Sequence, residues 1–512
     1  MAKRFTKKER VVDSVFEPPL TTARKIASES PLPEWLKGDW MWGLLLVLAV
    51  FVTYTPVWWA GYIWDDETFV TANPCIVGPL GLKEIWTTSA ADICPLTLTT
   101  VWFEHALWGL APLPYHLVNV LLHAACAVLL WRVLLSLRVP GAWLGAALWA
   151  LHPVQVESVA WITEMKNTQS GLFYLLSILF YVKWLRARDF DPEGEEKTSS
   201  EWNYELTLLF AVMAMASKSS TVVLPVVLCL CAWWIEGKWQ WRNLIRIVPI
   251  VLISLTACAL SIWTQGQQLG KVPDPQWART WPERLITAGD AVWFYLGKLI
   301  WPHPLMAIYP RWQIDAKEWF AYLPLLTVIA VSLGFWCNCR FRFRPWLFTY
   351  IYFLIVLLPV IGLNDFYYQR FSFVADHFQY LASMGPLSLA GAGLASFSDR
   401  IGSQRLWLQW TPAVGMLLIF GILSWQRSWV YQNNETLWTD TVIQNPNSWL
   451  AHTNLGASLS RKGRVDDAIV EYQKALKINS RYDVAHFNLG IAFAHREQLD
   501  EAITEFQEAL KI

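Results

Sequence analysis

The sequence predicts an all-α protein: a polytopic bundle of membrane helices followed by a short array of helical repeats. The composition is apolar, because 54% of the 512 residues are hydrophobic and only 16% are charged, whereas a soluble protein usually carries about 25% charged residues. The 34 Trp and 17 Tyr side chains are rings of the kind that collect at membrane–water interfaces. The net charge of zero gives no sign of a nucleic-acid partner.

Apolar runs long enough to cross a bilayer occupy most of the chain. A spanning helix needs about 20 mostly apolar residues. No cleavable signal peptide is visible, so the first run is expected to act as a signal anchor. Eleven spans are predicted, at about 40–60, 115–136, 142–161, 169–185, 204–217, 219–235, 245–263, 319–337, 346–363, 378–397 and 407–425.

The distribution of Lys and Arg orients these spans, because basic loops stay in the cytoplasm. The tail 1–38 is basic and is placed in the cytoplasm, as are the segments 186–203 and 236–246. The loop 61–112 has one Lys, no Arg and six carboxylates, which places it outside.

One apolar stretch, 285–301, is predicted not to span. It contains Asp290 and Lys298, and the basic run at 340–344 (Arg-Phe-Arg-Phe-Arg) reaches the cytoplasm only if this stretch stays on the outer side. We therefore expect an interfacial or re-entrant helix there. The resulting topology has the N-terminus inside and the C-terminus outside.

The C-terminal residues repeat with a period of 34 from residue 449, after a half-repeat with Trp438 and Pro446. The repeated residues match the tetratricopeptide pattern, in which each helix pair buries its apolar face on its neighbour. Stable arrays usually need about three repeats. This shorter array is therefore expected to be stabilised by packing against the membrane domain, another copy of the chain or a partner. It is either a structural cap or a protein-binding surface. The repeating pairs are Leu455-Gly456 with Leu489-Gly490, Ala468 with Ala502, Tyr472 with Phe506, and Ala475 with Ala509.

These features divide the chain into three parts. Residues 1–38 form a cytoplasmic tail, 39–425 the membrane domain with its outer loop 61–112, and 426–512 the repeats.

Three consecutive carboxylates, Asp65, Asp66 and Glu67, lie just beyond the first predicted span. Clustered like charges raise one another's proton affinity, so one Asp is suited to act as a general base. Two alternatives stay open: the oxygens hold a divalent cation, or the loop is simply acidic and solvated.

A polar stripe follows in the next span, where spacings of three and four residues put Tyr115, His116, Asn119 and His123 on one helical face. Polar groups facing lipid are costly, so this face should point into the bundle. Its side chains either line a site or serve as interhelical hydrogen bonds.

Further polar residues are expected on the outer side. After His152, Glu157 lies near membrane depth, where a carboxylate is functional by default; alternatively it pairs with Lys166. Lys218 lies in a tight turn and suits a phosphate, or it is a snorkelling interface anchor.

Arg370, Asp376 and His377 enter the tenth predicted span from the outside. Arg370 is suited to hold an anion, or else it forms an ion pair with Asp376. All these groups converge on one side of the bundle and supply both acids and bases. Transfer from a lipid-phosphate donor needs both: a base for the acceptor hydroxyl and cations for the departing phosphate.

The order of these motifs, with the appended repeats, resembles the transmembrane-and-tetratricopeptide-repeat family of O-mannosyltransferase-like proteins, which belongs to the GT-C class. The resemblance covers about residues 40–512. The motifs that carry it are Trp64-Asp65-Asp66, the stripe from Tyr115 to His123, His152-Pro153 with Glu157, Ser217-Lys218, and Ala375-Asp376-His377 with Tyr380.

The resemblance implies a GT-C-type bundle and an inverting glycosyltransferase. The donor would be a polyprenyl-phosphate sugar, typically mannose, and the acceptor a Ser or Thr hydroxyl of a protein. Asp65 or Asp66 then matches the catalytic base, and Glu157 the second acidic position. His116, Asn119, His123, His152 and Asp376 would line the substrate site.

Two departures concern the donor phosphate. Cys94-Pro95 stands where relatives often carry Arg-Pro, and Asp376-His377-Phe378 where they often carry Asp-Arg-Tyr. Lys218, Arg370 and His377 are therefore expected to supply the positive charge. The need for a divalent cation is left open.

Two other functions compete with the transferase. A non-catalytic scaffold would use the repeats to bind proteins outside the cytoplasm, but it has no need of Asp65 and Asp66 beside Glu157. A transporter would need a polar path and inverted repeats, and neither is evident. The expected location is a bacterial inner membrane facing the periplasm, or the endoplasmic reticulum in a eukaryote.

Overall fold

The computed structural model describes residues 38–88, 94–190, 197–270, 279–337, 343–401 and 406–512. In these ranges the chain is helical, with turns and loops between the helices and no strand. It forms two compact units, Met1–Leu45 and Leu46–Ile512. The first contains only the beginning of one described helix, so the fold described below is that of the second.

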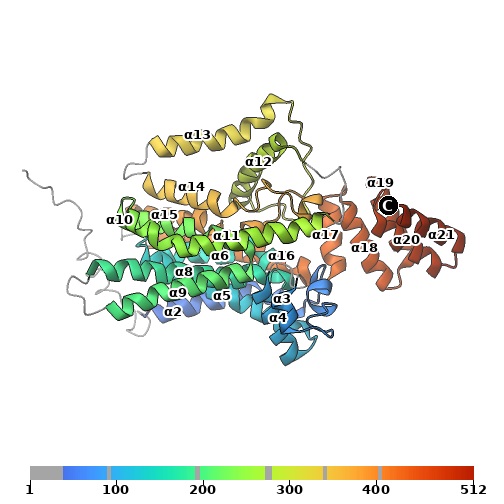
Figure 1. Ribbon diagram of the computed structural model, residues 1–512, viewed down its shortest axis with the longest axis horizontal. Coiled ribbons are helices and arrows are strands. Elements are labelled where there is room, and N and C mark those ends of the chain that lie inside the picture. The colour runs from blue at the N-terminus through green and yellow to red at the C-terminus, as the bar shows by residue number, and fades with distance from the viewer. Residues whose placement is uncertain (1–37, 89–93, 191–196, 271–278, 338–342, 402–405) are drawn as a thin grey trace, which may run out of the picture. The chain divides into compact units, whose positions relative to one another are not determined.

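The helices follow one another along the membrane domain and then through the repeats (Figure 1). They are α2 (Asp39–Thr53), α3 (Leu82–Thr87), α4 (Pro95–Trp108), α5 (Pro112–Ser136), α6 (Ala142–Leu151), α7 (Val156–Ala160), α8 (Met165–Phe190), α9 (Lys197–Ser217), α10 (Leu224–Glu236), α11 (Trp241–Gly270), α12 (Trp281–Ile300), α13 (Leu323–Cys337), α14 (Arg344–Leu357), α15 (Met384–Ile401), α16 (Leu406–Ser428), α17 (Asn434–Gln444), α18 (Trp449–Arg461), α19 (Val465–Ile478), α20 (Asp483–His495) and α21 (Leu499–Lys511).

As the sequence predicted, the described residues include helical segments that are long and apolar enough to cross a membrane. Five such segments are found among the described residues, and α2, α6 and α14 are shorter apolar helices. The predicted count of eleven spans stays a prediction. The five segments are Pro112–Ser136, Ser219–Glu236, Trp241–Thr264, Trp319–Cys337 and Trp410–Gln432.

Several predicted spans differ from the helices in their bounds. The run 142–161 is not one helix: α6 ends at Leu151, where Pro153 begins a 3₁₀ turn because proline offers no backbone N–H. The run 346–363 ends early, at Leu357, and the run 378–397 becomes helical only at Met384.

The stretch predicted as interfacial, 285–301, forms most of one continuous helix, α12, which ends at Ile300. It is not among the five membrane-length segments, and its position on the outer side stays a prediction. Most of the basic run at 340–344, like the tail 1–37, lies outside the described residues.

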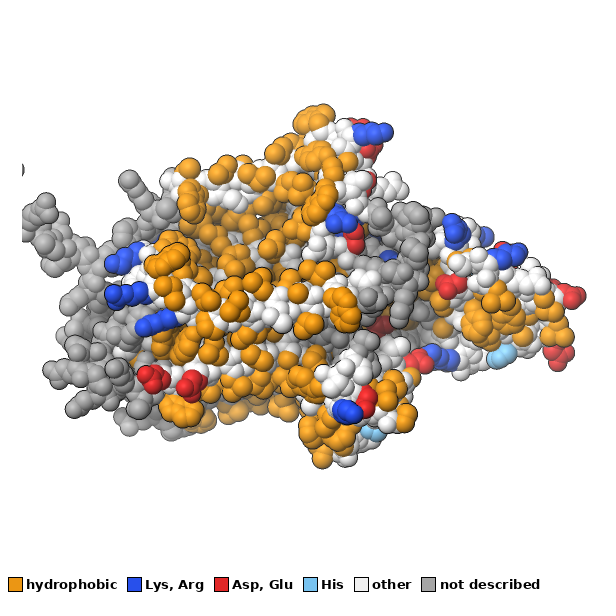
Figure 2. Space-filling view, in the orientation of Figure 1, with side chains coloured by type: hydrophobic (Ala, Val, Ile, Leu, Met, Phe, Trp, Pro, Cys, Tyr) orange, Lys and Arg blue, Asp and Glu red, His pale blue; other side chains and the backbone are white. Residues whose placement is uncertain are grey.

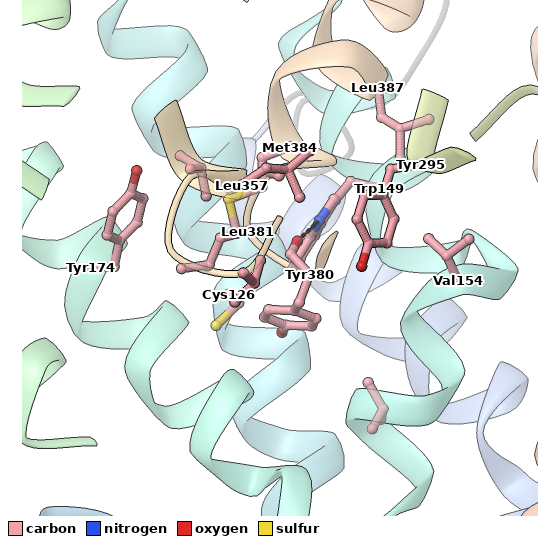
Figure 3. Packing of buried hydrophobic residues seen from close by; sticks show 14 of the residues in the cluster. Cys126, Trp149, Val154, Tyr174, Tyr295, Leu357, Tyr380, Leu381, Met384 and Leu387 are labelled. Atoms are coloured by element: carbon pink, nitrogen blue, oxygen red, sulfur yellow. Dashed lines mark hydrogen bonds between the residues drawn. The ribbon is translucent and has the colours of Figure 1, made fainter. Parts of the chain in front are cut away.

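Close helix packing holds the bundle together. A Cβ atom on Gly391 of α15 would lie 2.5 Å from the Cα of Gly145 of α6, so only glycine allows this backbone approach. Trp149 of α6 donates from Nε1 to the Tyr380 carbonyl at 3.0 Å, and His123 of α5 lies 2.8 Å from the Tyr380 hydroxyl. Figure 3 shows Trp149 and Tyr380 meeting inside this buried cluster.

The C-terminal helices form the predicted repeats. The helix pairs α18–α19 and α20–α21 follow α17, which is the half-repeat and buries Trp438. A Cβ on Gly456 would lie 2.6 Å from the Tyr472 ring, and one on Gly490 2.7 Å from the Phe506 ring. The Gly and aromatic positions of the pattern are therefore the contact points within each pair.

Candidate active site

The first outer loop meets the repeats at Trp64. Its indole stacks on Trp161 at 4.7 Å between ring centroids and meets Trp438 of α17 edge-on at 4.9 Å. Its backbone N–H donates to Asn434 Oδ1 at 2.8 Å. Trp64 has a φ of +45°, which is an outlier for a bulky residue. The surrounding contacts hold this strained turn, and they fix the direction of the two residues that follow.

Asp66 is a fully buried anchor of that loop. Its Oδ2 accepts from the Ile63 N–H at 2.9 Å. Its Oδ1 accepts from the backbone N–H of Thr163 at 2.8 Å and from the Thr163 hydroxyl at 2.6 Å. Burial raises the pKa of Asp66 to about 7, although the hydrogen bonds oppose the rise. The loop is thereby tied to the segment that follows α7.

Asp65 differs from Asp66 in its exposure. Asp65 is exposed and Asp66 is completely buried. Glu67 is also exposed, and it pairs with Arg461 of α18 at 2.9 Å. Of the two aspartates that the sequence left undecided, only Asp65 can therefore be reached by a substrate from solution.

His377 lies between two buried carboxylates. Glu157 Oε2 accepts from the His377 backbone N–H at 2.9 Å and lies 3.3 Å from its Nδ1. On the other side, His377 Nε2 lies 3.9 Å from Glu164 Oε1. Glu157 Oε1 is buried with no hydrogen-bond partner among the described residues. The fold thus brings together Glu157 and His377, which the sequence proposed for separate roles at one site.

Glu164 gathers the cations of the site. It lies 3.0 Å from Lys166 Nζ and 3.4 Å from Lys218 Nζ, and it accepts from Asn167 Nδ2 at 2.5 Å. Burial raises the pKa of Glu164, but the charges of His377, Lys166 and Lys218 outweigh burial and hold it well below its usual range.

These contacts answer two questions that the sequence left open: the role of Lys218 and the partner of Lys166. Lys218 points inward and donates to Asn167 Oδ1 at 2.5 Å, so it is not a snorkelling anchor. Burial lowers its pKa. Lys166 pairs with Glu164 and not, as one alternative had it, with Glu157.

Asp376 and Arg370 do not form the ion pair considered from the sequence. Asp376 Oδ1 accepts from the Tyr309 hydroxyl at 2.9 Å, and burial followed by the charge of Glu157 raises its pKa. Arg370 stacks over Tyr367 at 5.2 Å, and its charge opposes the rise in the pKa of Tyr482 in the repeats. Arg370 therefore faces the repeats, while Asp376 faces Glu157.

The polar stripe of α5 faces into the bundle, as predicted, and its bonds are mainly structural. Asn119 Nδ2 donates to the carbonyls of Ser158 and Val159 at 3.1 and 3.0 Å. His123 Nε2 lies 3.0 Å from the Ala150 carbonyl. Asn119 thereby fixes the chain directly after Glu157. His116 of the stripe is fully buried.

His152 is also a packing residue. Its Nε2 lies 3.1 Å from the Leu299 carbonyl and its Nδ1 accepts from the Val154 N–H at 3.3 Å. It shapes the turn between α6 and α7, which carries Glu157.

The sequence did not single out Thr163, Glu164 or Tyr309 as site residues. Thr163 has no chemical signature, and only the fold brings it to Asp66. Among the described residues, no group of three or more His, Cys, Asp or Glu side chains is arranged to hold a metal ion.

Comparison with known proteins gives two results. A TPR repeat family model matches residues 458–495. Protein O-mannosyl-transferase TMTC3 of Mus musculus is 21% identical over 85% of this chain and 50% of its own length. Protein O-mannosyl-transferase TMTC4 of Homo sapiens is 24% identical over 84% of this chain and 66% of its own length.

Another relative matches a shorter part of the chain with a higher sequence identity. Protein O-mannosyl-transferase TMTC2 of Mus musculus is 40% identical over 26% of this chain and 17% of its own length. The chain spans about half the length of the first curated relatives it matches. The resemblance drawn from the motifs is confirmed: over most of its length the chain is similar to the TMTC-type protein O-mannosyl-transferases.

Proposed function

We propose that this chain is a membrane glycosyltransferase that moves a sugar, mannose, from a polyprenyl-phosphate donor to a protein hydroxyl on the extracytoplasmic side. The observation that carries the proposal is a set of ring contacts that connects the loop of exposed Asp65 to a buried group of acids and bases. Trp64 stacks on Trp161, and Trp161 meets His377 edge-on at 6.2 Å. These ring contacts connect Trp64, the residue directly before exposed Asp65, to His377.

In the proposed reaction Asp65 is the general base. It takes the proton of the acceptor hydroxyl as that oxygen attacks the anomeric carbon of the sugar. The new bond joins the acceptor oxygen to the anomeric carbon, and the bond from that carbon to the phosphate oxygen breaks. The phosphate leaves with the electron pair, and the configuration inverts.

The cations around Glu164 are the proposed stabilisers of the departing phosphate. Preorganised positive charge in a site of low polarity lowers the energy of a developing negative charge. His377 and Lys218 are already fixed there by carboxylates, and Lys166 is partly exposed beside them. Arg370, which the sequence also offered for the phosphate, is withdrawn from this role because it faces the repeats.

Asp66 and Asn119 are proposed as positioning residues. Asp66 bonds Thr163, between α7 and α8, and Asn119 donates to the carbonyls of Ser158 in α7 and Trp161 just after it. The acceptor polypeptide would approach Asp65 beside the repeats, since Glu67 and Arg461 connect the loop to α18 there. A scaffold function would rest on the repeats alone and would not need the buried acids and bases.

Sugar transfer by the purified full chain in detergent tests the proposal. The donor is polyprenyl-phosphate mannose labelled in the sugar, and the acceptors are Ser- and Thr-containing polypeptides. We expect Asp65→Asn to lose transfer and Glu67→Gln, an exposed carboxylate two residues away, to keep it. Equal activity of Asp65→Asn and the unmodified chain would remove Asp65 as the base. No turnover with several lipid-linked sugars would favour the scaffold.

A further inference from the structure

Helix α4, in the loop between α2 and α5, has no charged side facing outwards. Its inner side buries Leu98, Val101 and Glu104. Of its 14 residues only Glu104 and His105 can carry a charge, and Glu104 is buried. The outward side of α4 therefore presents no Lys, Arg, Asp or Glu side chain to its surroundings.

Large apolar side chains make up that outward side. Phe103 and Leu107 are one helical turn apart, and both are exposed, Leu107 to 70%. Trp86 of α3, also exposed, lies against α4, because its Nε1 donates to the Thr99 hydroxyl at 2.9 Å. Figure 2 shows hydrophobic side chains over the lobe that α3 and α4 form. Proteins rarely leave a contiguous apolar surface of this kind in water, so we expect it to be covered.

The apolar surface continues from α4 into α5. Leu110 lies in the turn after α4 and Leu113 in the first turn of α5, and both are exposed. Leu121, eight residues after Leu113, is exposed on the same apolar stripe of α5. The segment Pro112–Ser136 is long and apolar enough to cross a membrane. The outward side of α4 is thus continuous with the side of a membrane-length helix that is suited to face lipid.

The short connection to α5 limits where α4 can lie. Residues 109–111 alone separate the two helices, and such a connection spans at most about 15 Å. The end of α4 therefore lies near the membrane surface that α5 enters. Trp108 is exposed at this end of the loop, and Trp58 and Trp59 are exposed at its other end, in the turn after α2. Tryptophan collects at membrane–water interfaces.

A lipid bilayer fits this surface better than a protein partner does. Protein interfaces surround an apolar centre with a polar rim, whereas the apolar surface of α4 runs on into α5 through Leu110 and Leu113. A helix that presents Trp, Phe and Leu on one side is suited to lie in the plane of the membrane interface. Because α4 has no charge on this side, its contact with lipid does not require anionic headgroups.

We propose that α4 is an interfacial helix that inserts its outward side, with Phe103, Leu107 and Trp108, into the headgroup region of the bilayer. The occupant of this surface is bilayer lipid, and not a second copy of the chain or another protein. The lipid contact does not depend on the proposed transferase activity.

The same helix is bonded to the candidate active site. The Thr97 hydroxyl of α4 donates to the Ser217 carbonyl at 3.0 Å, and Gln169 donates to the Thr100 hydroxyl at 3.0 Å. Ser217 directly precedes Lys218, which is one of the proposed phosphate-binding residues. The lipid contact of α4 therefore holds the Lys218 turn at a fixed depth beside the membrane surface, where lipid phosphates lie. This consequence, unlike the lipid contact itself, rests on the proposed function.

Photocrosslinking of the full chain in phosphatidylcholine nanodiscs tests the lipid contact. The photoreactive residue p-benzoylphenylalanine replaces Leu107 in one variant, Leu121 in a second and Leu499 of α21 in a third. Mass spectrometry after illumination identifies lipid adducts. Leu121 is the positive control on the membrane-length helix. Leu499 is the matched negative control, because it is 63% exposed but belongs to the last helix of the repeats. All three side chains are exposed, so the fold does not depend on them.

We expect a lipid adduct at Leu107 as strong as that at Leu121, and none at Leu499. With the photoreactive residue at Phe103, the further change Leu107→Glu should cause loss of the adduct, because a carboxylate draws this side of the helix out of the interface. No lipid adduct at Leu107 beside a strong one at Leu121 would show that α4 lies in water and would overturn the proposal. So would crosslinking of Leu107 to a second copy of the chain, or equal lipid adducts at Leu107 and Leu499. Sugar transfer is not measured, so a failure of the proposed function leaves this result unchanged.

Discussion

Thr163 holds Asp66 twice, through its backbone N–H at 2.8 Å and its hydroxyl at 2.6 Å. The two residues lie in different outer segments, and Glu164, the next residue after Thr163, collects the cations of the site. The contact therefore couples the position of the acidic loop to the position of the group proposed to bind the donor phosphate. Asp65 directly precedes Asp66 in the sequence, and Glu164 directly follows Thr163.

The first prediction concerns this contact. Thr163→Val keeps the backbone bond to Asp66 but loses the hydroxyl bond, so we expect a cost of about 1.5–3 kcal/mol, as for a hydrogen bond to a charged group. Asp66→Asn should cost at least as much, because its amide group cannot accept from all three donors. The measurement is thermal unfolding of each variant in detergent. Asp65→Asn is the control and should unfold like the unmodified chain; a similar loss in that variant would show that both aspartates are structural.

The second prediction concerns Lys218 and Glu164. Both side chains are largely buried, at 15% and 1% exposed, so removing one charge leaves the other poorly compensated. We expect Lys218→Met and Glu164→Gln each to destabilise the chain and the double variant to cost less than their sum, with a coupling of about 1–3 kcal/mol. A double-mutant cycle of unfolding free energies measures the coupling. Additive effects would mean that Lys166 and His377 carry the charge balance without Lys218.

The third prediction is a pH dependence that comes from Glu104 in α4. Neither of its carboxyl oxygens has a hydrogen-bond partner among the described residues, and burial raises its pKa to about 8 from an ordinary value of 4.5. Between these two values the folded chain keeps a proton that the unfolded chain releases. The free energy of unfolding therefore falls as the pH rises through this window. Asp66, with a pKa of about 7, contributes a fall of the same sign.

Glu104→Gln should remove part of this dependence, because an amide has no proton to lose. Melting temperatures from pH 5 to pH 9 should decline for the unmodified chain and decline less for Glu104→Gln, with the largest gain at pH 9. Glu67→Gln, at an exposed carboxylate, serves as the control and should follow the unmodified chain. Parallel curves for Glu104→Gln and the unmodified chain would show that Glu104 is ionised at neutral pH.

The fourth prediction concerns the repeats. A Cβ on Gly456 would lie 2.6 Å from the Tyr472 ring, so Gly456→Ala forces the two helices of that repeat apart. Overpacking of this kind costs about 1–3 kcal/mol. Thermal unfolding followed by circular dichroism measures the loss. Gly415→Ala, where the added Cβ meets no atom within 4 Å, should instead be neutral; equal effects at the two glycines would point to helix propensity and not to packing.

The sequence predicted the parts of the fold that depend on local patterns. The Gly and aromatic positions of the repeats follow from a 34-residue period, and the structure confirms Gly456 against Tyr472 and Gly490 against Phe506. The polar stripe of α5 was predicted to face inward, and Asn119 and His123 are buried. The bounds of the spans were less accurate. Apolar composition continues through His152-Pro153, but the helix does not, because the proline interrupts its hydrogen bonding.

The roles of the site residues were harder to predict. Asp65 and Asp66 are chemically identical neighbours, and only their surroundings make one exposed and the other buried. Arg370 and Lys218 both suited a phosphate by charge, yet Arg370 stacks over Tyr367 and Lys218 approaches Glu164. Thr163 carried no signal, because a hydroxyl has no distinctive role until a buried carboxylate lies next to it.

By itself the sequence determined that this chain is an apolar helical protein with membrane-length helices and two tetratricopeptide helix pairs. It also predicted a set of polar residues for lipid-linked sugar transfer, which stays a proposal. These features follow from the amino-acid composition and from the repeat period, which do not depend on contacts between distant segments. Tertiary structure alone decided which carboxylate is accessible and which cations Glu164 collects. Contacts between residues such as Asp66 and Thr163 depend on how distant segments pack, and no local pattern records that packing.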